Sequence, residues 1–244
     1  MFNTWTRLTR HLPATCQVCG GWPAQAVCVA CEQRFAAPTP RCGACAAPLA
    51  ATGPALCGAC QTRTAPAALQ RCVAAVDYSY PWDTLIARFK FRNEPGWAGT
   101  LAALMWRAHQ AQPPSSPYDL VVPVPLTPSR LASRGYNQAW ELVKALRRQA
   151  VATATPMPPA LADALLRIGE APDQHSLPRE QRLHNLRGAF AAHPLHRQRL
   201  ARAHVLLVDD VTTTGATLQT AAQTLLQAGA HRVDALVLAR TPPH

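Results

Sequence analysis

The sequence has few acidic residues, almost no lysine and no long apolar run. Of 244 residues only 13 are Asp or Glu, and the 24 basic residues include just two lysines, Lys90 and Lys144. No stretch approaches the roughly 18 consecutive apolar residues of a membrane-spanning helix. Arg7, Arg10 and His11 also interrupt the first residues before any apolar run develops. These absences argue against membrane insertion and a secretory signal, and we expect a cytoplasmic protein.

The composition is that of a globular protein with a basic surface. Apolar residues make up 48% of the chain, enough to bury a core, and the formal net charge is +11. An excess of this size favours polyanionic partners such as phosphates or nucleic acid. The strong preference for Arg over Lys is also typical of a compositional habit of the source genome. Charge alone therefore decides little about function.

The cysteines divide the chain into two regions. All nine lie in the first 72 residues, a segment with a single acid, Glu32. The polar stretch 61–71 is too short to add a core element and is interpreted as a linker or a helix end. We therefore expect a cysteine-rich zinc-ribbon domain over residues 1–72 and an α/β domain over residues 73–244.

Eight of the cysteines form C-x-x-C pairs. Two such pairs supply the four thiolates of a tetrahedral zinc site, and a complete set of thiolates leaves no open position for chemistry. The sequence thus predicts one or two structural zinc ions held by Cys16, Cys19, Cys28, Cys31, Cys42, Cys45, Cys57 and Cys60. Sequential pairing is the first choice, although spacing also permits an interleaved pairing. A disulfide framework or a redox pair is a less favoured alternative, and Cys72 is expected to be a buried apolar residue.

The region after Cys72 has the pattern of a parallel α/β domain. Apolar runs predict strands over 73–78, 120–124, 161–168, 205–208 and 233–239, and longer periodic segments predict helices over 82–89, 97–109, 136–149 and 217–228. The strand, helix and strand of the last segment have the spacing of a right-handed crossover in a parallel sheet. Residues 169–187 are predicted to form a long polar loop, and long loops are often functional.

The run from His204 to Thr217 reads H-V-L-L-V-D-D-V-T-T-T-G-A-T, so two carboxylates follow an expected strand and a Thr-rich turn leads into a helix. Ligands of open α/β sheets collect beyond the carboxyl ends of the strands. There Asp209 and Asp210 can accept hydrogen bonds from the two vicinal hydroxyls of a ribose. Threonine hydroxyls, the backbone at Gly215 and the amides of the helix start form a phosphate cradle. Ribose and phosphate on one loop indicate a 5-phosphoribosyl ligand.

This loop resembles the motif that binds 5-phosphoribosyl-1-pyrophosphate (PRPP) in type I phosphoribosyltransferases, where four apolar residues precede two acids and a T-T-G-x-T turn. It is neither a Walker A loop, because no lysine follows Gly215, nor a G-x-G-x-x-G loop. The resemblance implies a parallel-sheet fold of that type and a catalytic role for the acidic pair. It implies PRPP contacts from Asp209, Asp210, Thr212, Thr213, Thr214, Gly215, Ala216 and Thr217. The alternative is a plain strand-turn-helix with solvated aspartates.

With the cysteine pairs ahead of this loop, the whole chain resembles the ComF family, zinc-ribbon proteins with a phosphoribosyltransferase-like domain that are linked to DNA uptake in competent bacteria. Residues 122–139 resemble the family segment that lies where type I enzymes hold pyrophosphate, with Arg130 and Arg134 as its cations. Residues 88–92, R-F-K-F-R, resemble a basic-aromatic segment of the family. Ordinary surface arginines and a solvated helix end are the alternatives.

The resemblance extends to a segment that lies where type I enzymes carry the mobile loop over PRPP. This segment contains Arg167, Gln174, Arg182, Asn185 and Phe190. Closure of such a loop excludes water from a reactive leaving group. Transferases of this fold displace magnesium pyrophosphate from the anomeric carbon, so magnesium is the expected cofactor with PRPP. No motif identifies a catalytic base, and His175 and His184 are weak candidates.

Three functions are compatible with the sequence. The first is an enzyme that transfers a phosphoribosyl group to a base or an amine. The second is a protein that handles single-stranded DNA, together with DNA-uptake machinery, and uses its PRPP site as a sensor or keeps it as a relic. The third, a structural adaptor, predicts no small ligand. The intact loop favours a PRPP site more strongly than it favours turnover.

Overall fold

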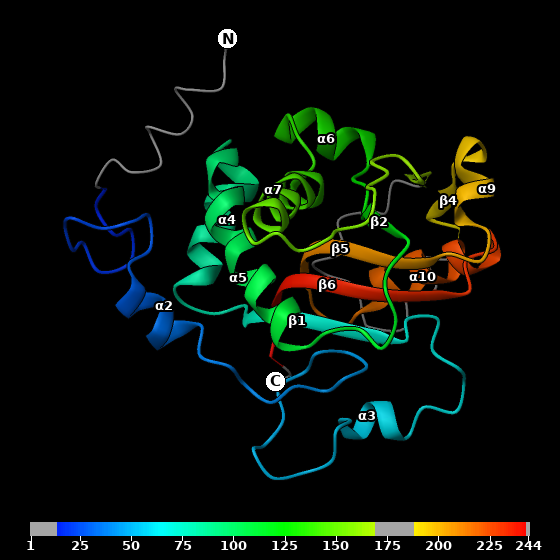
Figure 1. Cartoon of the computed structure of the whole chain (residues 1–244), viewed down its shortest axis with the longest axis horizontal. Coiled ribbons are helices and arrows are strands. Elements are labelled where there is room, and N and C mark those ends of the chain that lie inside the picture. The colour runs from blue at the N-terminus through cyan, green and yellow to red at the C-terminus, as the bar shows by residue number, and fades with distance from the viewer. Residues whose placement is uncertain (1–13, 169–187, 243–244) are drawn as a thin grey trace. The chain divides into compact units, whose positions relative to one another are not determined.

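The computed structural model describes residues 14–168 and 188–242, which are drawn in colour in Figure 1. The chain divides into two compact units between Pro38 and Thr39. The smaller unit contains helix α2 (Val29–Phe35) and an antiparallel bridge between Ala14 and Ala24. The larger unit holds the other helices and strands labelled in Figure 1. The domain boundary expected at residue 72 remains a proposal.

A four-stranded parallel sheet forms the centre of the larger unit, in the order β1-β6-β5-β2. Its strands are β1 (Arg71–Asp77), β2 (Leu120–Pro123), β5 (His204–Thr212) and β6 (Arg232–Arg240). All four residues of β2 and eight of the nine in β6 are buried, as expected of strands covered on both faces. The α/β fold with a parallel sheet is thereby confirmed.

Helices cover both faces of this sheet (Figure 1). The larger ones are α4 (Trp82–Phe91), α5 (Ala98–Ala111), α6 (Pro128–Arg134), α7 (Gln138–Ala152) and α10 (Ala216–Gln227). Because side chains alternate along a strand, β5 directs Leu207 into one core with Leu218 of α10. The neighbouring Leu206 lines a cavity on the other face together with Trp106 of α5 and Leu146 of α7. The sheet is therefore the middle of three layers.

The remaining elements are short. They are α3 (Gly58–Gln61), the 3₁₀ turns η2 (Pro95–Trp97) and η4 (Pro194–His196), α9 (Arg197–Leu200), and the antiparallel pair β3 (Leu165–Arg167) and β4 (Phe190–Ala192). The strand expected over 161–168 is thus reduced to three residues outside the main sheet. The expected loop 169–187 lies outside the described residues. Within the described part of the chain, no helix has the length and apolar character needed to cross a membrane.

Strand β5 is longer than its apolar run. The sequence predicts a strand that ends at Val208, whereas pairing with β6 continues to Thr212 opposite Arg240. Backbone hydrogen bonds of the ladder extend the strand through the polar residues that follow the apolar run. The two aspartates therefore belong to the strand itself, near its carboxyl end.

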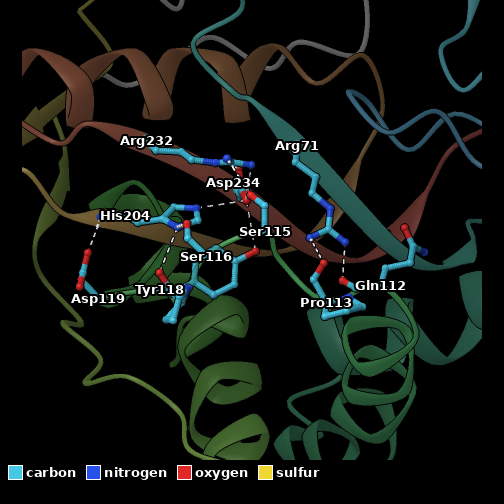
Figure 2. Close-up of polar contacts among 11 residues, drawn as sticks. Arg71, Gln112, Pro113, Ser115, Ser116, Tyr118, Asp119, His204, Arg232 and Asp234 are labelled. Carbon is cyan, nitrogen blue, oxygen red and sulfur yellow. Dashed lines mark hydrogen bonds and ion pairs between the residues drawn. The ribbon is translucent and has the colours of Figure 1, made fainter.

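A buried polar cluster occupies the opposite, amino-terminal ends of β5 and β6 (Figure 2). The carboxylate of Asp234, which is fully buried, accepts hydrogen bonds from Tyr118 Oη at 3.3 Å and Arg232 Nε at 3.1 Å, and lies 3.2 Å from His204 Nε2. Burial and the charge of Asp234 raise the pKa of Tyr118, which keeps its donor proton. Because these groups satisfy one another far along the strands from Asp209, we assign them a structural role.

Replacing Asp234 by Asn should therefore destabilise the protein without touching the loop. We expect the free energy of unfolding to fall by about 3 kcal/mol, because the change removes the charged acceptor that Tyr118, His204 and the half-buried Arg232 share. Tyr118→Phe, which removes one long hydrogen bond, should cost about 1 kcal/mol. Urea unfolding followed by circular dichroism measures both. An Asp234→Asn variant as stable as Tyr118→Phe would contradict the assignment.

Candidate functional site

The Thr-rich turn connects β5 to α10 and presents the start of that helix. Gly215 forms the N-cap of α10 with φ at +79°, in the left-handed region that favours glycine. No atom lies within 4 Å of the position a Cβ would take there, so backbone conformation, and not crowding within the chain, requires glycine. Thr214 Oγ1 accepts a hydrogen bond from the amide of Ala216 at 3.3 Å. A left-handed residue at a helix start arranges backbone amides into an anion-binding concavity.

The two aspartates lie side by side at the carboxyl end of β5. Asp210 is buried, and its Oδ1 atom is 2.9 Å from Nζ of Lys90, which α4 supplies. Asp209 Oδ1 accepts the amide of Asp210 at 2.8 Å. Burial and the neighbouring charge of Asp210 raise the pKa of Asp209 to about 7, although Lys90 acts in the opposite direction. The acidic pair therefore concentrates negative charge that cations or hydroxyl donors would stabilise.

Four cations surround this pair around a cavity of about 180 Å³. Lys90 comes from α4, Arg130 and Arg134 come from α6, and Arg167 comes from β3, while Thr217 of α10 lines the same cavity. The side chain of Arg134 is held by Gln138 Oε1, which accepts its Nη1–H at 2.9 Å. Burial lowers the pKa of Arg134. More cations than carboxylates in a partly buried space favour an anionic ligand.

Arg167 has an unsatisfied donor in this arrangement. Its guanidinium carbon lies 4.7 Å from the centroid of the Phe190 ring, and its buried Nε atom has no hydrogen-bond partner among the described residues. Burial and the charge of Arg130 lower its pKa. A buried donor without a partner is costly unless a ligand supplies an acceptor. Arg167 is therefore well suited to contact an anion in the cavity.

The remaining predicted loop residues face different spaces. Thr213 lines a second cavity with Lys90, and Thr214 lines a third with Arg63. Thr212 and Ala216 are buried, and Thr212 accepts hydrogen bonds through its backbone. His175 and His184 lie outside the described residues.

The sequence did not place Lys90 and Arg167 at the acidic pair. One signal was present for Lys90, which is one of only two lysines in an arginine-rich chain. Arg167 belongs to a segment that resembles the family, but neither Arg167 nor Lys90 is near residues 209–210 in the sequence. Only the packing of α4 and β3 brings them to β5.

The cysteines form two quartets in sequential order. Within each quartet the four sulfur atoms lie within 4.8 Å of one another, and the quartets are Cys16, Cys19, Cys28 and Cys31, then Cys42, Cys45, Cys57 and Cys60. A tetrahedron with Zn–S bonds of 2.3 Å has sulfur–sulfur edges of about 3.8 Å. The separations of Cys19 from Cys28, at 3.8 Å, and of Cys45 from Cys57, at 3.6 Å, fit that geometry. Both quartets are therefore compatible with structural zinc.

Hydrogen bonds from backbone amides favour the thiolate form of one cysteine in each quartet. Although burial opposes ionisation, amide hydrogen bonds lower the pKa of Cys16 to about 6 and that of Cys42 to about 7. A thiolate is the form that binds zinc. This donor set is complete with four sulfurs, so it leaves no open position for a substrate.

The second quartet belongs to the larger unit and is joined to the strand that carries the acidic pair. Arg240 of β6 donates through Nε to the carbonyl of Cys45 at 3.1 Å and through Nη1 to the carbonyl of Thr212 at 3.4 Å. Arg41, beside the quartet, pairs with Asp77 at 2.7 Å. The second quartet and the last residue of β5 thus share one buried arginine.

Known proteins resemble the chain over almost its whole length. It is 31% identical to DNA utilization protein YhgH of Salmonella typhimurium over 94% of this chain and 98% of that protein. For YhgH of Escherichia coli K12 the identity is 32% with the same coverage, and for Competence protein F of Haemophilus influenzae it is 31% over 88% of this chain and 90% of that protein. No family model matches the chain. This chain belongs to the ComF family.

Solved structures resemble this ComF protein more distantly. Glutamine PRPP amidotransferase from B. subtilis matches 57% of the chain and 26% of its own, with a TM-score of 0.33 and 21% identity. Hypoxanthine-guanine phosphoribosyltransferase from Schistosoma mansoni matches 62% of this chain and 63% of its own, with a TM-score of 0.31 and 12% identity. At these TM-scores the likeness adds nothing to the assignment of the site.

The raised pKa of Asp209 gives the unliganded ComF protein a specific pH dependence. In the unfolded chain this carboxyl has the ordinary value of 3.8, whereas in the folded protein the pKa is about 7. Unfolding between these values releases a proton, so the free energy of unfolding should fall as pH rises from 5 to 8. We expect Asp209→Asn to remove at least about 1 kcal/mol of that fall. Urea titrations of both proteins at the two pH values test this, and parallel pH profiles would contradict it.

The bond network of Arg240 predicts that only the second quartet affects the loop. If the loop binds PRPP, as the family resemblance implies, replacing Cys42 and Cys45 by Ser should weaken that binding severalfold, because a quartet without two of its thiolates no longer fixes the Cys45 carbonyl that holds Arg240 beside Thr212. The matched change of Cys16 and Cys19 to Ser alters the quartet of the other unit and should leave the affinity unchanged. Calorimetric titration with magnesium and PRPP compares them. Equal effects from the two pairs of substitutions would rule out the link.

Proposed function

We propose that this ComF protein binds PRPP with magnesium and is a phosphoribosyltransferase-type protein that acts in DNA uptake. One observation carries the proposal. The adjacent carboxylates of β5, Thr217 in the first turn of α10 and four cations line a single cavity in the larger unit. Ribose hydroxyls, a terminal phosphate and a pyrophosphate require these three kinds of partner. The family relatives named for DNA utilization and competence support the biological role.

Each part of PRPP has a matching part of the site. The 5-phosphate would bind the backbone amides of the turn and the hydroxyl of Thr217. The two ribose hydroxyls would donate to Asp209 and Asp210, and hydroxyls bonded to carboxylates make strong charge-assisted bonds. The pyrophosphate would lie against Arg130 and Arg134, with the unsatisfied Nε of Arg167 as a further donor. Magnesium, when bound with PRPP, neutralises charge on the leaving pyrophosphate.

In the transfer reaction the bond between the anomeric carbon and pyrophosphate breaks, and a base or an amine forms the new bond. Positive charge develops on the ribose ring as the leaving group departs. The carboxylates of Asp209 and Asp210 would stabilise that charge through the hydroxyls they hold, and the guanidinium groups would stabilise the departing pyrophosphate. Preorganised electrostatics of this kind supply most of the rate enhancement in many enzymes. The two aspartates are thus the proposed catalytic residues.

The second candidate is a non-catalytic protein that handles single-stranded DNA and uses PRPP as a signal. The described lining of the PRPP cavity favours it in one respect, since it includes no histidine and the only acids are Asp209 and Asp210. No general base for an acceptor is therefore evident in that part of the chain. We propose zinc in both cysteine quartets and a cytoplasmic location for either function.

Replacing both aspartates by Asn tests the PRPP site. Each charge-assisted acceptor is worth roughly 1.5 to 3 kcal/mol, so affinity for magnesium PRPP should fall at least tenfold. Asp163→Asn changes an exposed acid that pairs with His196 outside the cavity, and it should leave affinity unchanged. Isothermal titration calorimetry measures all three proteins. Two results would overturn the proposal: wild-type protein that does not bind magnesium PRPP, or a double variant that binds it as tightly as wild type.

A further inference from the structure

A second cavity opens beside the acidic pair. It has a volume of about 930 Å³ and shares Lys90, Arg130 and Arg134 with the smaller cavity. This size is at the upper end of the range for small-molecule sites. We call it the outer groove, lined by Tyr78, Lys90, Phe91, Arg130, Arg134 and Thr213, among others. Its position next to the loop means that a ligand there would lie beside bound PRPP.

Phe91 places an aromatic ring in the outer groove. It is the last residue of α4 and is 69% exposed, whereas Phe89, two positions earlier, is completely buried. Helical geometry turns residues two apart to different sides, so Phe89 packs in the core while Phe91 faces outward. The guanidinium carbon of Arg134 lies 5.0 Å from the centroid of the Phe91 ring. A cation at this distance attracts the ring and fixes it beside a charged group.

The charge of the outer groove selects the kind of ligand. Its described lining includes three cations, Lys90, Arg130 and Arg134, and no acidic residue. Lys90 already neutralises Asp210, so the positive field of the groove comes mainly from the two arginines of α6. A ligand that matches an exposed ring and a positive field contains both a planar aromatic group and an anion. A nucleotide has both.

We propose that the outer groove binds single-stranded nucleic acid, with one base stacked on Phe91 and the adjacent phosphates paired with Arg130 and Arg134. Aromatic platforms next to a positive groove bind single strands without sequence preference, because every base has a stacking face. A duplex does not fit this chemistry, since its bases are already stacked on one another. The volume of the groove, about 930 Å³, fits a strand better than a selective site for a single free nucleotide.

The shared arginines link this groove to PRPP. This part of the inference rests on the proposed function, in which Arg130 and Arg134 also hold pyrophosphate. Two anions that need the same guanidinium groups oppose each other, so bound PRPP should weaken strand binding. Linkage is reciprocal, and strand binding should weaken PRPP binding by the same factor. PRPP would then act as a signal that releases the strand.

The test uses the full-length protein and a short fluorescein-labelled oligothymidylate, with binding followed by fluorescence anisotropy at fixed salt. Stacking of one base is worth about 1 to 3 kcal/mol, so Phe91→Ala should weaken binding about fivefold or more. Phe91→Trp keeps a stacking face and should retain wild-type affinity. Val151→Ala is the matched control, because Val151 is an 83% exposed apolar residue on α7 outside the groove. Saturating magnesium PRPP should lower the wild-type affinity.

Three results would overturn the inference. If Phe91→Ala protein binds the oligonucleotide as tightly as wild type, the Phe91 ring does not stack on a base of the strand. Duplex DNA bound as tightly as the single strand would indicate a general basic surface, and thymidine monophosphate bound as tightly as the oligonucleotide would indicate a site for free nucleotides. Wild-type titration with PRPP alone separates the two proposals. Phe91-dependent strand binding without PRPP binding would retain the groove and reject the PRPP site, and the reverse result would do the opposite.

Discussion

The repulsion between the adjacent carboxylates of Asp209 and Asp210 is the constraint on which the rest of the site depends. Two acids in sequence on a buried strand cannot both ionise without compensation: burial and then the charge of Asp210 raise the pKa of Asp209 to about 7. Lys90 from α4 offsets one charge, and three arginines border the same cavity. Without a ligand, such a cluster of charges lowers the stability of the folded protein. A ligand with hydroxyl donors and phosphates would interact favourably with both the carboxylates and the cations.

The sequence predicts much of this site because its central part is local. Residues 204–217 contain the acidic pair, the turn and the helix start in one run, and the turn needs glycine at position 215 for a backbone angle of +79°. The two quartets are also local, because cysteines three residues apart form each half of a site. Short-range chemistry of this kind is readable from spacing, whereas the sequential combination of the cysteine pairs became evident only in the fold.

The contributions from distant elements could not be predicted in the same way. Lys90 comes from a helix more than a hundred residues before Asp210, and Arg167 reaches the cavity from a short strand outside the main sheet. The apolar pattern also predicts too short a strand β5. Backbone pairing with β6 extends the strand through polar residues, which an apolar pattern does not detect. Each of these features depends on tertiary packing and not on local propensity.

A crystal structure of the protein with magnesium and PRPP tests the central claim most directly. The account predicts the 5-phosphate on the backbone amides between Thr213 and Thr217, with both ribose hydroxyls within hydrogen-bond distance of Asp209 and Asp210 and pyrophosphate against Arg130 and Arg134. PRPP bound at another surface, or in this cavity with its ribose away from both carboxylates, would contradict the account.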